Sequence, residues 1–243
     1  MKTLGYKAND VDAIELALSP ERFRPYVLRA GGSRVRAVQI YERNTAISEA
    51  LYGVTQAEVA VRNAMNRSLV SAFGEIWFDI APLEDRQREK IAAAKVELTR
   101  SKRPISTGAL VAELSFGFWT ALGSKTYEKS LWVPCLHKAF HAVTIDPKTN
   151  NVTTYNRNEI FDRLDSIRDL RNRIAHHEPI LKYDLPRKFN EVIRALEWVC
   201  PTSAQWMQST NNFWQRYNEK PLSYSPPKLP AEVARTAPGT PKR

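Results

Sequence analysis

Apolar residues recur at intervals of three and four along most of the chain, and glycine is scarce. This spacing gathers apolar side chains on one face of an α-helix, whereas a half-buried strand alternates apolar and polar residues. The pattern therefore predicts an all-α fold, a helical bundle with additional helices. The expected helices lie at about 20–30, 33–52, 55–73, 84–100, 105–114, 132–142, 156–178, 189–199 and 206–217.

Local signals set several of these helix ends. Ser19-Pro20 joins a capping hydroxyl to a proline suited to a first helical turn, and Gly31-Gly32 stops the helix that follows. The segment from Thr55 to Glu58 has the Thr-x-x-Glu pattern of a capping box, and Gly74 ends that helix. Pro179 limits the 156–178 helix, because the residue before a proline disfavours α-helical geometry.

Two segments depart from the helical pattern. The stretch 146–151 is polar and rich in turn-forming residues, which predicts a turn. The segment 221–243 holds six of the fifteen prolines and almost no large apolar residues. It cannot close an apolar face, so we expect it to be disordered. The predicted organisation is one helical domain over 1–220 and a proline-rich basic tail.

The chain is strongly basic. It has 243 residues, with 36 lysines and arginines against 26 acidic residues, which gives a formal net charge of +10. The tail has four basic residues against Glu232, so it holds +3 and the rest of the chain +7. A basic body favours a polyanionic partner, and nucleic acid is the first candidate.

The cysteines and the N-terminus bear on the compartment. Cys135 and Cys200 have no CxxC spacing and no disulfide framework, which fits a reducing environment. Asp10, Asp12 and Glu15 interrupt the apolar run that a signal peptide needs, and no stretch reaches the roughly 18 apolar residues of a spanning helix. We expect a cytoplasmic protein with no membrane partner.

Common cofactor and metalloenzyme motifs are missing from the sequence, which contains no GxxxxGK[ST], GxGxxG, HExxH, GxSxG or paired CxxC. We therefore expect no cofactor. His137 and His141 are four residues apart and, with Cys135 nearby, could share a metal on one helical face. No further His or Cys spacing completes a ligand set, so we interpret these residues as part of a helix and expect no metal.

The segment 168–179 carries the candidate chemistry. Arg171 falls on the apolar stripe formed by Ile160, Leu164, Ile167 and Ile174, where a charged guanidinium is costly unless it meets an anion. One interpretation is a buried arginine that ties helices together through a carboxylate such as Glu58. The other is a clamp for a phosphate group, because the guanidinium fork matches phosphate geometry.

His176 and His177 follow in the predicted last turn, where the helix dipole favours a protonated imidazole. Arg171 and His176 are five residues apart, so on a straight helix they point about 140° away from each other. Two copies of the helix about a two-fold axis could instead bring an arginine and a histidine of both chains into one cleft. The geometry thus suggests a homodimer.

Three blocks of sequence together resemble a known family. The motif segment is LRNRIAHHEPI (170–180), preceded along the chain by AEVAVRNAMNRSLVSAFGEIWF (57–78) and LVAELSFGFWTAL (110–122). In this order the blocks resemble Abi-like (abortive infection) proteins of the HEPN superfamily, over roughly residues 19–199.

The resemblance implies a HEPN-like helical fold, a homodimer and a metal-independent endoribonuclease. Arg171 matches the arginine of the family's Arg-x4–6-His motif, Asn172 the polar residue after it, and His176 the histidine. His177 also lies within the permitted spacing, so it stays an alternative.

Residues of the first block add to this site: Glu58 and Arg62 are candidate supporting residues. The implied role is an effector of antiviral (phage) defence or the toxin of a toxin–antitoxin pair, with RNA as substrate and an antitoxin or sensor protein as a further partner. Silencing through a modified tyrosine two positions after the histidine does not transfer, because Glu178 or Pro179 stands there.

Two other functions remain open. The first is a non-catalytic RNA-binding or dimeric interaction module with the same fold. The second is a helical DNA-binding protein, for which the sequence offers no clear helix-turn-helix.

Overall fold

The computed structural model describes residues 6–141, 143–145, 152–154 and 156–219, and they form two compact units. The first unit comprises 1–51, 173–183 and 212–243, and the second comprises 52–172 and 184–211. The predicted turn at 146–151 and the predicted tail at 221–243 lie outside the described residues. The predicted domain boundary at residue 220 therefore stays a prediction.

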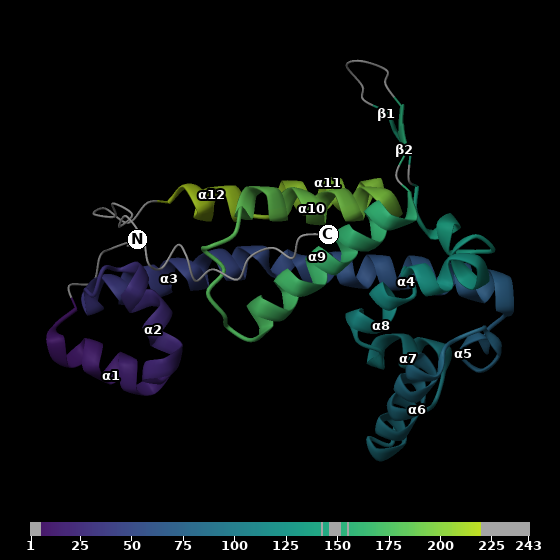
Figure 1. The fold of residues 1–243 in the computed structure, drawn as a ribbon, viewed down its shortest axis with the longest axis horizontal. Coiled ribbons are helices and arrows are strands. Elements are labelled where there is room, and N and C mark those ends of the chain that lie inside the picture. The colour runs from purple at the N-terminus through teal and green to yellow at the C-terminus, as the bar shows by residue number, and fades with distance from the viewer. Residues whose placement is uncertain (1–5, 142, 146–151, 155, 220–243) are drawn as a thin grey trace. The chain divides into compact units, whose positions relative to one another are not determined.

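The first unit contains four helices among its described residues. α1 and α2 pack on each other and on α3, and α12 also packs on α3. The core between them is apolar, built around Phe23, Tyr26 and Ile40. In chain order these helices are α1 (Ala8–Leu18), α2 (Pro20–Arg29), α3 (Arg34–Ala50) and α12 (Phe213–Asn218), shown in Figure 1.

The second unit is organised around one long helix, α4 (Val54–Phe73), which follows a single turn of 3-10 helix, η1 (Leu51–Gly53). α4 packs against several other elements of its unit, including α10, α8 and η4. The remaining helices of the unit are α5 (Trp77–Ile80), α6 (Asp85–Arg100), α7 (Thr107–Glu113), α8 (Phe116–Ala121), α10 (Leu185–Val199) and α11 (Pro201–Thr210).

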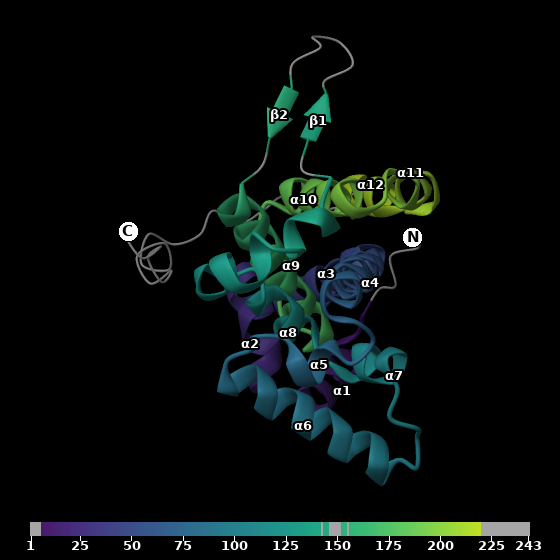
Figure 2. The same cartoon turned by 90° about the vertical axis from the view of Figure 1, so that its right-hand side faces the viewer.

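The segment between α8 and α9 is irregular. It contains η2 (Lys125–Tyr127), a π-helical turn η3 (Glu128–Trp132) and a 3-10 turn η4 (Leu136–Ala139). Two short strands follow, β1 (Val143–Ile145) and β2 (Val152–Thr154), which pair antiparallel with Val143 opposite Thr154 (Figure 2). α9 (Arg157–Ala175) then runs through the end of the second unit, and its last three residues belong to the first.

The prediction of a mainly helical protein is confirmed, with the β1–β2 ribbon as an addition that the spacing did not indicate. Ser19 caps α2 as expected, because its hydroxyl accepts a hydrogen bond from the amide of Arg22 at 3.4 Å. Gly74 ends α4 with a positive φ of 79°, a geometry that glycine adopts without strain.

Several predicted helix limits are wrong. α4 begins at Val54, so Thr55 lies inside the helix and the expected capping box does not form. The predicted 132–142 helix is replaced by η3 and η4, because Pro134 lacks an N–H and disfavours helical geometry before it. The predicted 206–217 helix is two helices, broken at Asn211-Asn212, where asparagine side chains compete for backbone hydrogen bonds.

Candidate active site

Arg171 lies in the second unit, beside the buried face of α9. The side chains that face the core are Ile160, Leu164, Ile167 and Leu170. Leu170 thus continues the buried stripe, and Arg171 flanks it with 40% of its side chain exposed. The predicted position on the stripe itself is corrected by one residue, which removes most of the cost of burying the guanidinium.

The charge of Arg171 meets a carboxylate of the same chain. Its Nε donates to Oε2 of Glu58 on α4 at 3.2 Å, and its Nη1 donates to the side-chain oxygen of Asn172 at 3.4 Å. Glu58 is only 8% exposed, so the pair links α9 to α4 in a partly desolvated setting. The interhelical tie through Glu58, one of the two interpretations of Arg171, is therefore present.

Arg62 lies one helical turn after Glu58 on α4. Its Nε is buried and has no hydrogen-bond partner within the described residues. A buried donor without an acceptor is costly, and an anion would satisfy it. Glu58, Arg62 and Arg171 together carry a net positive charge.

Further cations of the second unit lie around Arg168 of α9. Arg168 precedes Arg171 by three residues on α9 and forms an ion pair with Asp165 at 2.7 Å. The pKa of Lys90 on α6 is lowered because the group is partly buried and because the charges of Arg86 and Arg168 oppose its own. Like charges held together in this way favour a bound polyanion.

The two histidines follow the end of α9 in the first unit. The helix ends at Ala175, three residues before the predicted end, so His176 and His177 lie beyond its last turn. His177 has a φ of 54°. The amide of His177 donates to the carbonyl of Ile174 at 3.0 Å. The amide of Glu178 donates to the carbonyl of Arg173 at 2.8 Å.

These two hydrogen bonds form a Schellman motif, in which His177 takes the left-handed position usually filled by glycine. His176 is the cap residue, and both imidazoles are exposed. The two candidates therefore differ in backbone role: His177 ends the helix, whereas the backbone of His176 has no such special geometry.

The chain after the histidines is held by residues that the sequence analysis missed. Asn44 of α3, only 3% exposed, accepts a hydrogen bond from the amide of Ile180 at 2.8 Å and donates to the carbonyl of Glu178 at 3.4 Å. Arg173 pairs with the Glu178 carboxylate at 2.6 Å. A signal for Asn44 existed, because it lies between Ile40 and Ile47 on the apolar stripe of its helix.

The structure thus brings part of the candidate site together. Arg171, Asn172 and Glu58 are in mutual contact through Arg171, and Arg62 lies on the same α4 helix as Glu58. His176 and His177 belong to the other unit, whose boundary falls between residues 172 and 173.

The residues considered for a metal do not share a helical face, because η4 ends at Ala139. The Cys135 thiol donates to the carbonyl of Leu131 at 3.2 Å, and His137 Nδ1 lies 3.0 Å from the carbonyl of Trp132. No group of three metal-ligating side chains occurs in the described part of the chain.

Comparison of the chain with protein-family models, with curated proteins and with solved structures finds no match. Among the described helices, none combines the length and the apolar character that crossing a bilayer requires.

Proposed function

We propose that this protein is a metal-independent endoribonuclease with a HEPN-like fold, acting as an abortive-infection effector or as the toxin of a toxin–antitoxin pair. The observation that carries the proposal is that Arg171 is half-exposed on α9 and that His176, five residues later in the chain, is exposed just after the helix ends. The three sequence blocks that resemble Abi-like HEPN proteins support it.

The surroundings of Arg171 favour an anionic substrate. The guanidinium keeps an exposed part while Glu58 fixes its position, so a phosphate can approach it without a rearrangement of α9. Arg62 offers a buried donor on the neighbouring helix, and Arg86, Lys90 and Arg168 add positive charge.

RNA supplies its own nucleophile, so the protein needs only proton transfer and charge stabilisation. His176 takes the proton of a 2′-hydroxyl, whose oxygen forms a bond to the adjacent phosphorus. The bond from phosphorus to the 5′-oxygen breaks, and a second histidine donates a proton to that leaving oxygen. Arg171 stabilises the charge of the transition state, and Asn172 orients the phosphate or ribose. The products are a 2′,3′-cyclic phosphate and a 5′-hydroxyl.

The second histidine of this scheme is His176 of another copy of the chain, which makes the homodimer part of the proposal. Glu58 already supplies an anion for Arg171 within one chain. The charge of Arg171 therefore does not by itself require a partner chain. The homodimer is proposed because the reaction needs two proton-transfer groups.

A non-catalytic RNA-binding or interaction module is the second candidate, favoured by the same ion pair. A structural arginine would contact a buried carboxylate as Arg171 contacts Glu58. Incubation of the purified chain with total RNA in EDTA separates the two. Fragments ending in a 2′,3′-cyclic phosphate support the ribonuclease, and intact RNA at high protein concentration leaves the binding module.

A further inference from the structure

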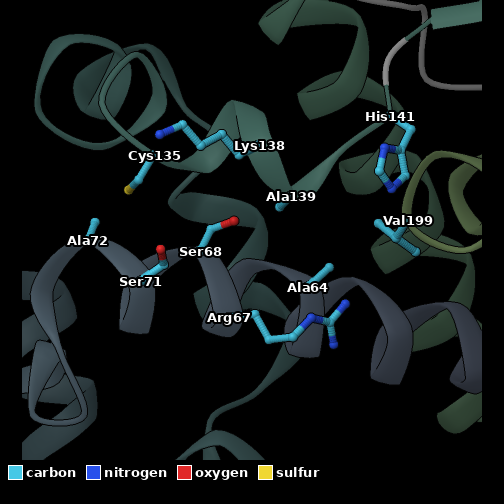
Figure 3. A pocket seen from close by; sticks show the side chains of 10 residues that line it. All are labelled: Ala64, Arg67, Ser68, Ser71, Ala72, Cys135, Lys138, Ala139, His141 and Val199. Carbon is cyan, nitrogen blue, oxygen red and sulfur yellow. The ribbon is translucent and has the colours of Figure 1, made fainter.

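A pocket of about 300 Å³ lies in the second unit between α4 and the 135–141 segment (Figure 3). On the α4 side its wall is made by Arg67 and by four small residues, Ala64, Ser68, Ser71 and Ala72, at intervals of three and four along the helix. The four small side chains leave room for a ligand beside the arginine. The two hydroxyls can donate hydrogen bonds to this ligand.

The pocket is lined by basic side chains and by no acidic ones. The basic side chains are Arg67, Lys138 and His141. Within the part of the chain that the structure describes, neither Arg67 nor Lys138 forms an ion pair.

The Cys135 thiol adds no negative charge. The thiol is buried and donates a hydrogen bond to the carbonyl of Leu131. Burial raises its pKa, which keeps it protonated. In Figure 3 the Lys138 side chain lies toward Cys135, and the Arg67 guanidinium lies on the other side of Ser68, near Ala64. A ligand in the pocket is thus flanked by a cation at each end and by hydroxyls in the middle.

We propose that this pocket binds a phosphate monoester carried on a sugar-sized body, either as a free small molecule or as the 5′-phosphate end of an RNA strand. Two cations and two hydroxyls without a competing carboxylate are the donors that phosphate accepts. A volume of about 300 Å³ is at the lower end for small-ligand pockets, which suits a phosphate and one ring.

The pocket is separate from the candidate active site. Arg67 follows Glu58 by nine residues on α4, which corresponds to about 13.5 Å along the helix and half a turn around it. The phosphate site therefore does not depend on Arg171 or on RNA cleavage, and either proposal can fail while the other holds.

The test is calorimetric titration of the full chain with ribose 5-phosphate, with ribose as the ligand lacking phosphate. We expect the wild type to bind ribose 5-phosphate at one site and ribose not at all. Arg67→Gln and Lys138→Gln should each weaken binding about tenfold or more, the scale of one charge-assisted hydrogen bond. Arg100→Gln, which removes an exposed arginine from α6 in the same unit, is the matched control and should bind normally.

Ser68→Val narrows the pocket without changing any charge, and it should also weaken binding. The source of the phosphate is distinguished by short RNAs that carry a 5′-phosphate or a 5′-hydroxyl. Binding of ribose 5-phosphate assigns a free ligand, and binding of only the 5′-phosphorylated RNA assigns the strand end. Absence of binding to both phosphate ligands, or equal affinity in Arg67→Gln, Lys138→Gln and Arg100→Gln, overturns the proposal.

Discussion

Arg171 has a structural contact, and a chemical role is proposed for it. Its contact with Glu58 joins two helices, and the same contact holds the guanidinium with part of its surface open to solvent. The sequence could predict that a carboxylate such as Glu58 would meet this arginine, because a guanidinium beside an apolar stripe needs an anion. It could not predict which face of α9 is buried. Residues 170 and 171 are adjacent on the helix, and only contacts with other helices determine which of the two side chains is buried.

Replacing Glu58 separates the two roles of Arg171. Glu58→Gln removes the competing charge, so RNA should bind more tightly at low salt while the free energy of unfolding falls. Arg171→Gln should weaken binding and reduce the slope of log affinity against log salt by about 0.7, the value for one phosphate contact to a single strand. Filter binding over a salt series measures both.

Glu97→Gln is the control for the Glu58 experiment, because it removes a carboxylate from an exposed pair with Arg100 on α6. It should change neither RNA binding nor stability by much. If Glu58→Gln and Arg171→Gln lower the free energy of unfolding and leave RNA binding unchanged, Arg171 is a structural residue only.

The two histidines can be told apart through the backbone. His177→Gly places the preferred residue in the left-handed position, and the free energy of unfolding should rise by about 0.5–1 kcal/mol. RNA cleavage should persist. His176→Gly, one residue earlier, should lower the free energy of unfolding by about 0.5–1 kcal/mol, since glycine gains nothing there.

Denaturant unfolding and an RNA cleavage assay on the same samples measure these effects. Loss of cleavage in His177→Gly together with normal cleavage in His176→Gly would assign the chemistry to His177.

At the scale of elements, α9 is joined to α10 by polar contacts that the sequence did not predict. Glu191 of α10 is only 9% exposed and accepts a hydrogen bond from Ser166 of α9 at 2.7 Å. Lys188 approaches the same carboxylate at 3.2 Å and also contacts Ser166. A glutamate within an amphipathic helix gives no sequence signal of burial, because its partners come from another helix.

Glu191 makes this link dependent on pH. Burial alone would raise the pKa of its carboxyl group, but the hydrogen bond from Ser166 and the charges of Lys188 and Arg187 outweigh burial and lower it. The lowered pKa means that the ionised carboxylate stabilises the fold above its ordinary value of 4.5, and that this stabilisation is lost as pH falls through the lowered value.

Glu191→Gln should therefore lower the free energy of unfolding at pH 7 by about 1–3 kcal/mol. The difference from the wild type should shrink as the pH falls below about 4.5. Chemical denaturation at several pH values measures it, and Glu197→Gln, in an exposed pair on the same helix, should show little difference at any pH. A gap between Glu191→Gln and wild type that is constant from pH 7 to pH 3 would contradict the assigned linkage.

Helix ends illustrate what the sequence can and cannot predict. Ser19 and Gly74 act through neighbours within four residues, so their roles follow from local sequence. The predicted start of α4 is one residue late, and Glu58, the acidic residue of the predicted capping box, bonds to Arg171, 113 positions away. The end of α9 was misplaced because Pro179 sets only a limit, whereas the Schellman motif at His177 stops the helix earlier.

At the scale of the whole molecule, the division into units passes through the candidate site. Arg171 and Asn172 end the second-unit part of α9, and His176 follows in the first unit. Within the motif, the chain passes from one unit to the other between residues 172 and 173.

The proposed homodimer has a direct measurement. Light scattering of the full chain at micromolar concentration should give twice the chain mass of 27.8 kDa, because the mechanism needs a proton-transfer group from each copy. A monomer that still cleaves RNA would remove the dimer from the mechanism and leave both proton transfers to one chain.

In the proposed reaction His176 transfers a proton to or from RNA without a metal. The most direct measurement compares RNA cleavage and RNA binding by wild type, His176→Ala and the control His137→Ala, all in EDTA. We expect wild type and His137→Ala to cleave alike, and His176→Ala to lose about 10² to 10⁴ in rate with unchanged RNA affinity and melting temperature. Full cleavage by His176→Ala, or intact RNA with the wild type, would contradict this assignment.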